Sequence, residues 1–180
     1  MAKIKSRNET LIRTPADAEA LMDLLRQSAR KVHDWVAAQG GDPLDMLERM
    51  KFEPVGFHPI EGYELNLVEQ INQTWTYAVA IAAAKQLLHL HPDAKGFYLA
   101  PGAHAARPLD IMSVVENMVG AETCAVVHPR NNGKIEKDVA KLEARSERYR
   151  YAFFMCPKFP RNERHSEFER SGVQVWSIRV

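Results

Sequence analysis

Apolar residues recur at helical spacing in two long segments of the first half of the chain. The segment 14–41 opens with a threonine cap and a proline and stops at two glycines, which are typical helix boundaries. The segment 64–91 is rich in alanine and is followed at once by a proline. Between them, 42–63 contains three prolines and two glycines, and it predicts an ordered connector with one or two helical turns at 44–47.

Beyond residue 91 the apolar spacing shortens from the helical period to two, the period of a half-buried strand. Turn-forming residues at 116–120 join two of these segments and predict a hairpin. A helical segment at 133–145 separates the third and fourth strands, which allows them to pair in parallel. The predicted fold class is α/β, with a mixed central sheet and flanking helices. The predicted strands are 96–100, 108–115, 121–128, 149–156 and 173–178.

The length of 180 residues favours a single domain, with 1–63 as an N-terminal helical extension and connector and 64–180 as the core. A net charge of +1 provides no strong overall field for a polyanion. The segment 130–170 has eleven Lys or Arg against seven Asp or Glu, an excess of four that suits either a nucleic-acid surface or an ordinary solvated one. Two cysteines in apolar segments and the lack of a bilayer-length apolar run favour a reduced, cytoplasmic protein without a membrane partner.

Two carboxylates interrupt the apolar pattern of the second and third predicted strands. Asp110 and Glu122 lie where lone charged side chains are disfavoured. If the two strands pair around the predicted turn, Asp110 lies opposite a residue between Glu122 and Cys124. Adjacent carboxylates repel unless a cation relieves them, so the pattern predicts a Mg²⁺ site that Mn²⁺ can also occupy. The alternative is that each carboxylate is paired with an arginine, with Arg107 the obvious candidate.

Three features together resemble the PD-(D/E)xK nuclease superfamily. They are a glutamate-bearing helix, a hairpin carrying Asp and then Glu, and a basic helix opening at Arg130-Asn131-Asn132-Gly133-Lys134. The resemblance covers 64–156, roughly half of the chain. It implies a restriction-endonuclease-like α-β-β-β-α-β core and a divalent-metal-dependent nuclease activity. Because the motif is degenerate, the order of the elements carries more weight than any single residue.

The resemblance assigns roles to individual residues. Asp110 and Glu122 would be metal ligands, and Glu69 would match the glutamate of the preceding helix, with Glu64 the weaker candidate. Gln73 lies one turn beyond Glu69 and would orient that carboxylate or a metal-bound water. The alternative for this helix is that its polar residues are simply the solvated side of an amphipathic helix.

The chain departs from the family at Cys124, which stands where the family has lysine. A neutral thiol can neither orient an attacking water nor stabilise developing negative charge as an ammonium does. Lys134 or Lys137 is expected to reach in from the next helix, and loss of activity is the competing explanation. A nucleophilic Cys124 paired with His104 or His128 is a further alternative.

The expected function is therefore that of a nucleic-acid-acting protein, a Mg²⁺-dependent phosphodiester hydrolase. The alternative is a catalytically degenerate nuclease fold that serves as a nucleic-acid-binding or assembly module. A homo-oligomer, such as a dimer formed through the long N-terminal helix, is also expected. The expected nucleic-acid contacts are His104, Arg107, Arg130, Asn132, Lys134 and Lys137.

Overall fold

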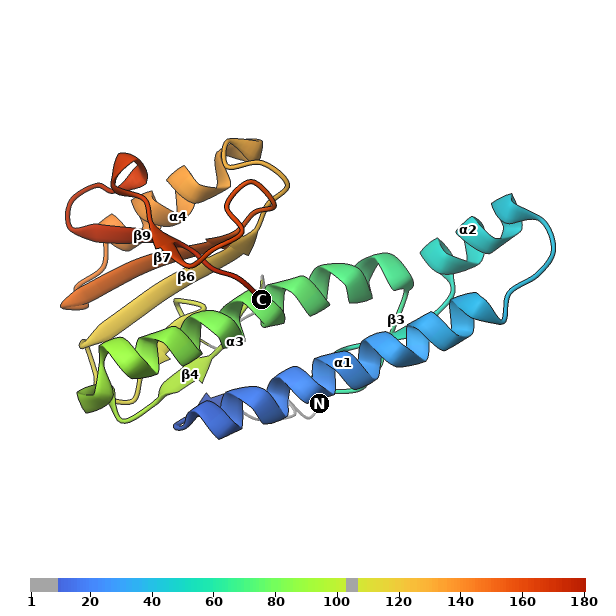
Figure 1. The fold of residues 1–180 in the computed structure, drawn as a ribbon, viewed down its shortest axis with the longest axis horizontal. Coiled ribbons are helices and arrows are strands. Elements are labelled where there is room, and N and C mark those ends of the chain that lie inside the picture. The colour runs from blue at the N-terminus through green and yellow to red at the C-terminus, as the bar shows by residue number, and fades with distance from the viewer. Residues whose placement is uncertain (1–9, 103–106) are drawn as a thin grey trace, which may run out of the picture.

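A mixed seven-stranded sheet with helices on both faces dominates the computed structural model, which describes residues 10–102 and 107–180 (Figure 1). The predicted α/β class with a mixed sheet and flanking helices is confirmed. In sheet order the strands are β1 (Thr10–Ile12), β4 (Phe97–Leu99), β5 (Ile111–Ser113), β6 (Val119–Ala125), β7 (Tyr149–Met155), β9 (Val173–Ser177) and β8 (Glu163–Arg164). The helices are α1 (Pro15–Ala37), α2 (Pro43–Phe52), α3 (Leu67–Leu90) and α4 (Lys134–Glu143), with short 3₁₀ turns η1 (Pro92–Ala94), η2 (Asn131–Gly133) and η3 (Ser166–Phe168).

The pairing of the strands changes direction at β6. Strands β4, β5 and β6 are successive antiparallel neighbours, as the predicted hairpin requires. Helix α4 then leads to β7, which pairs with β6 in parallel, and β9 adds to β7 in parallel as well. Strands β1 and β8 complete the two edges in antiparallel pairs.

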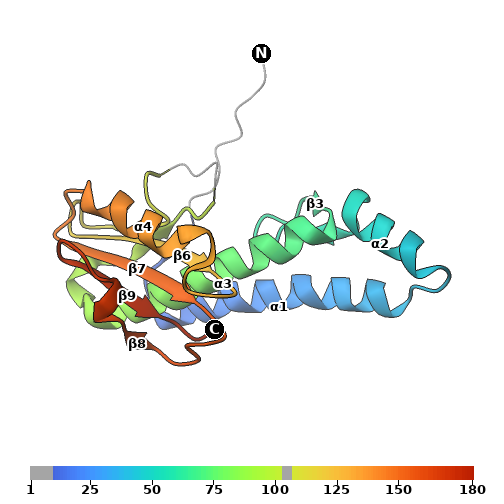
Figure 2. The same cartoon turned by 90° about the horizontal axis from the view of Figure 1, so that it is seen from above.

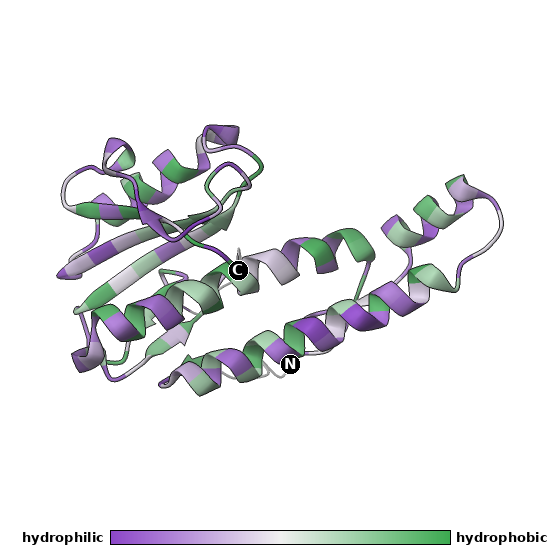
Figure 3. Ribbon diagram, in the orientation of Figure 1, coloured by the Kyte–Doolittle hydropathy of each residue, from purple (hydrophilic) through white to green (hydrophobic). Residues whose placement is uncertain are grey.

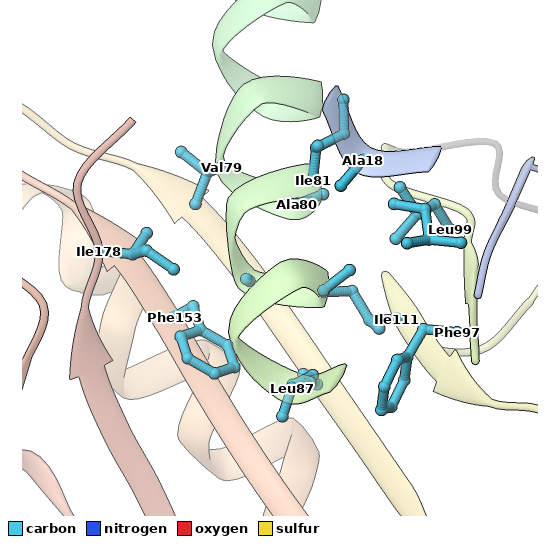
Figure 4. Close-up of a cluster of buried hydrophobic side chains, with 14 of the residues drawn as sticks. Ala18, Val79, Ala80, Ile81, Leu87, Phe97, Leu99, Ile111, Phe153 and Ile178 are labelled. Carbon is cyan, nitrogen blue, oxygen red and sulfur yellow. The ribbon is translucent and has the colours of Figure 1, made fainter. Parts of the chain in front are cut away.

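Helices α1 and α3 cover one face of the sheet and α4 covers the other. Alternate residues of β6 divide between the faces: Ala121 joins the cluster under α3, whereas Cys124 joins the cluster under α4. The alanines of α3 allow the helix to lie close to the strands (Figure 4). The cluster on this face includes Val79, Ala80, Ile81, Leu87, Phe97, Ile111, Phe153 and Ile178.

The first helix begins where its capping residues predict. Thr14 Oγ1 accepts a hydrogen bond from the Asp17 backbone N–H at 3.2 Å, and the Asp17 carboxylate accepts one from the Thr14 N–H at 2.8 Å. This reciprocal capping box satisfies N–H groups that the helix itself leaves unpaired. Helix α2 is likewise capped by Asp42, which explains why it is longer than the one or two turns expected.

Helices α1 and α3 continue beyond the sheet and form an arm with α2 at its far end (Figures 1 and 2). A second, two-stranded sheet of β2 (Gly56–Phe57) and β3 (Glu64–Leu65) lies beside the arm. The buried amide of Gln70 joins these parts, since it accepts from the Phe57 N–H at 2.6 Å and donates to the Ser28 carbonyl at 3.1 Å. No helix in the described ranges is long and apolar enough to span a bilayer.

Several predicted helices and strands are longer than the observed ones. Helix α3 begins at Leu67 rather than 64, because Glu64 and Leu65 pair with β2. Strand β5 has three residues instead of eight, because Ser113 Oγ accepts the Val119 N–H at 2.9 Å and holds the chain in a turn.

Candidate functional site

The two carboxylates predicted to be neighbours lie together across β5 and β6. Ile111 pairs with Ala121, so Asp110, one residue before β5, lies across from Glu122. The Asp110 backbone N–H is 3.4 Å from Glu122 Oε1. The predicted proximity of Asp110 and Glu122 is therefore confirmed.

The Asp110 side chain ends the pairing between the two strands. Its Oδ2 accepts hydrogen bonds from the Thr123 backbone N–H at 2.8 Å and from Thr123 Oγ1 at 2.9 Å. A carboxylate thus takes the place of a strand carbonyl at this position. Asp110 has a structural function in the sheet whatever else it binds.

Glu122 is buried and charged groups surround it. Its side chain is 5% exposed, whereas Lys141, whose Nζ lies 2.7 Å from Glu122 Oε1, is 48% exposed. Burial raises the pKa of Glu122 and the nearby Asp110 carboxylate raises it further, while Lys141 opposes the rise. Glu122 is therefore a buried carboxylate whose bonded lysine, Lys141, is half-exposed.

A second ion pair lies one to two turns earlier on α4. Lys134 bonds to Asp138, whose side chain is also 5% exposed. Burial raises the pKa of Asp138, and the hydrogen bond from Lys134 opposes this rise. Although desolvation lowers it, the bond to Asp138 raises the pKa of Lys134 overall. Lys134 is therefore a firmly charged group held by Asp138, and the lysine that contacts Glu122 is Lys141.

Cys124 lies beside Asp138 as a protonated thiol. Burial raises the pKa of the Cys124 thiol, and the Asp138 carboxylate raises it further. A nucleophilic cysteine needs the opposite shift. His128 is exposed, with its Nδ1 accepting the Arg130 N–H at 3.2 Å, and His104 lies outside the described residues. The structure contradicts a nucleophilic role for Cys124.

Glu69, the glutamate expected on the preceding helix, does not lie with Asp110 and Glu122. Glu69 is exposed in the first turn of α3, where its N–H bonds to the capping Asn66 side chain at 2.8 Å. Helix α3 lies across the sheet from α4, and its first turns extend along the arm. Glu64 is exposed in β3, and Gln73 is half-buried on α3. The structure therefore gives no support to Glu69 as a third ligand.

The expected nucleic-acid contacts divide into two groups. Arg107 lies with its guanidinium 3.8 Å from the centre of the Tyr98 ring. Arg130, Asn132 and Lys137 are exposed around the start of α4. Lys134, Lys137 and Lys141 recur at helical spacing and share one side of α4, the side that reaches the carboxylates.

Asp138 and Lys141 were missed by the sequence reasoning. Residues 134, 138 and 141 follow the same helical spacing as the apolar residues 135, 139 and 142. This pattern would have placed Asp138 and Lys141 beside the buried face of the helix. A carboxylate at a core-facing helical position was the available signal.

The donor set suits a hard divalent cation that keeps most of its water. Asp110 and Glu122 offer carboxylate oxygens, and Mg²⁺ is commonly held by one or two carboxylates. With Asp138, Lys134 and Lys141 included, three acids stand against two ammonium groups, so these five residues leave one negative charge. Within the described ranges, no group of three or more His, Cys, Asp or Glu side chains is arranged to hold a metal ion.

Comparisons of the chain with protein-family models, curated proteins and solved structures found no match.

Proposed function

We propose that the chain is a divalent-metal-dependent phosphodiester hydrolase of the PD-(D/E)xK type that acts on nucleic acid. The observation that carries the proposal is the succession α3-β4-β5-β6-α4-β7 with Asp110 beside Glu122 across β5 and β6. The order α-β-β-β-α-β is the order that the resemblance implies. In this chain the first three of these strands are antiparallel neighbours and the fourth pairs in parallel.

Asp110 and Glu122 would hold Mg²⁺. Burial and the neighbouring Asp110 raise the pKa of Glu122 although Lys141 opposes them, so the ionised form of Glu122 would gain from a cation bound beside it. When bound, the cation would supply Lewis-acid stabilisation of the phosphate and a more acidic water. The cation would also relieve the repulsion between the two carboxylates.

Lys141 would supply the ammonium group that the family has at position 124, where this chain has a cysteine. Its ammonium reaches Glu122, a proposed metal ligand, from α4, and its side chain is half-exposed, so a phosphate bound beside Glu122 would lie within its reach. The expected role of Lys134 changes because its ammonium bonds to Asp138, which is not one of the two proposed ligands. Together with Arg130 and Lys137, Lys134 would contact the phosphate backbone of the substrate.

A non-cleaving nucleic-acid-binding module is the second candidate function. The observation in its favour is that the acids of the site already have partners within the chain: Asp110 accepts from Thr123, and Glu122 accepts from Lys141. A metal must compete with Lys141 for Glu122. Nucleic-acid binding that Lys137→Ala weakens, without cleavage in Mg²⁺ or Mn²⁺, would favour this candidate.

The proposal is tested by calorimetric titration of the chain with Mg²⁺ and Mn²⁺. We expect a binding signal with the wild type that is lost in Asp110→Asn, a change that removes the charge while leaving an acceptor for Thr123. Glu69→Gln is the matched control, since it removes an exposed carboxylate on the other side of the sheet. Absence of binding in the wild type, or equal binding in Asp110→Asn, would refute the metal site.

A further inference from the structure

The overhanging part of α3 presents apolar side chains to solvent. Val68, Ile71 and Trp75 recur at helical spacing on one side of the helix and are exposed by 47%, 50% and 43%. Trp75 also lines a hollow of about 450 Å³ with Val127, Met155 and Pro157 at the ends of β6 and β7. We call Val68, Ile71, Trp75 and Val127 the arm face. Helix α3, which carries three of these residues, continues past the sheet (Figures 1 and 3), and Val127 lies just after the end of β6.

Helix α2 adds exposed apolar residues at the far end of the arm. It has ten residues, none of them buried, and Leu44 and Leu47 are 72% and 57% exposed. An isolated helix shorter than about 12–15 residues is marginal in water, so such a helix depends on packing. Within the chain, Arg49 of α2 lies over the Trp35 ring and bonds to Gln39, and α2 also contacts α3. Leu44 and Leu47 of this helix remain exposed to solvent.

The geometry points to a second copy of this chain as the partner of the arm face, with the leucines of α2 at the edge of the contact. The six residues are between 43% and 76% exposed. Each partner in a specific dimer buries about 800 Å², contributed by roughly 20–30 residues, so these six would form the apolar centre and edge of such a contact.

Self-association also fits the charges and shape of the face. Positions 68, 71, 72 and 75 carry Val, Ile, Asn and Trp, so this strip of the overhanging helix is uncharged, with the exposed Glu69 at its border. In a two-fold dimer equivalent residues meet or lie close, and an uncharged surface avoids repulsion between them. In a two-fold pair, the projecting α3 of each copy can pack against the apolar hollow of the other copy.

This interface differs from the one expected through the long N-terminal helix. The buried apolar residues of α1, Ala18 and Leu25, belong to the same core cluster as those of α3. They are therefore used within the chain. The exposed apolar residues on α3 and α2 remain for a partner.

The inference is tested by sedimentation velocity across a range of protein concentrations, without metal or nucleic acid, so its outcome is independent of the proposed activity. We expect a dimer for the wild type and a monomer for Ile71→Glu. Leu24→Glu is the matched control, since Leu24 is 41% exposed on α1, away from the arm face, and this variant should remain dimeric. Circular dichroism establishes that each variant is folded, and Val68→Glu, at an arm-face residue that is 47% exposed, replaces Ile71→Glu if that variant does not fold. A wild type that stays monomeric, or a dimer that survives the folded arm-face variant, would overturn the inference.

Discussion

At the residue scale, Glu122 is a buried carboxylate whose ionised form is disfavoured. Because burial and Asp110 raise its pKa in the folded chain, the folded state binds a proton more tightly than the unfolded state does. Stability is therefore lost as pH rises from about 4.3 through the raised value. We expect Glu122→Gln to raise the melting temperature at pH 7 by about 2–4 °C, the shift that ~1 kcal/mol produces in a chain of this size. Melting curves at several pH values check this, and a gain that did not shrink towards pH 4 would contradict it.

Burial also gives His91 a pKa shift that makes stability depend on pH. Its imidazole is buried against Tyr149 and Tyr151, with Nε2 2.7 Å from the Tyr151 hydroxyl. Burial lowers the pKa of His91, so the unfolded state binds the proton more tightly, and stability falls as pH drops below about 6.5. We expect His91→Gln to weaken this acid sensitivity, as measured by urea unfolding between pH 7 and pH 5. His33→Gln, a histidine substitution at an exposed side chain, is the control.

At the element scale, α4 supplies the positive charge of the site. Lys141→Met would leave Glu122 buried without its cation, and we expect a loss of about 1–3 kcal/mol in the free energy of unfolding. Lys137→Met, on the same side of the helix but exposed, should have little effect. In the double variant Glu122→Gln, Lys141→Met, most of the loss should be recovered, because no charge remains unpaired. In urea unfolding, a double variant whose change in free energy equals the sum of the two single changes would contradict the pairing.

Also at this scale, the sequence predicted the long elements well and the short ones poorly. The helices at 14–41, 64–91 and 133–145 have enough turns for their apolar period to stand out. Strands β1 and β8, with three and two residues, are defined by their partners rather than by any pattern of their own. Asp110 and Glu122 could be brought together because a hairpin fixes the register around its turn.

At the scale of the whole molecule, the contacts that sequence reasoning missed are those between distant segments. Nothing local indicates that Lys141 rather than Lys134 reaches Glu122, since this depends on how α4 crosses the sheet. Nothing local indicates either that the first turns of α3 extend beyond the sheet and carry Glu69 away from the acids. The same overhang separates an arm with an exposed apolar face from the sheet that carries the carboxylates.

The most direct test of the account is cleavage of end-labelled DNA and RNA by the purified chain in Mg²⁺ and in Mn²⁺. We predict metal-dependent cleavage by the wild type that is abolished in Asp110→Asn and retained in Glu69→Gln. Absence of cleavage of either substrate in both metals, or unchanged cleavage by Asp110→Asn, would contradict a phosphodiester hydrolase built on Asp110 and Glu122.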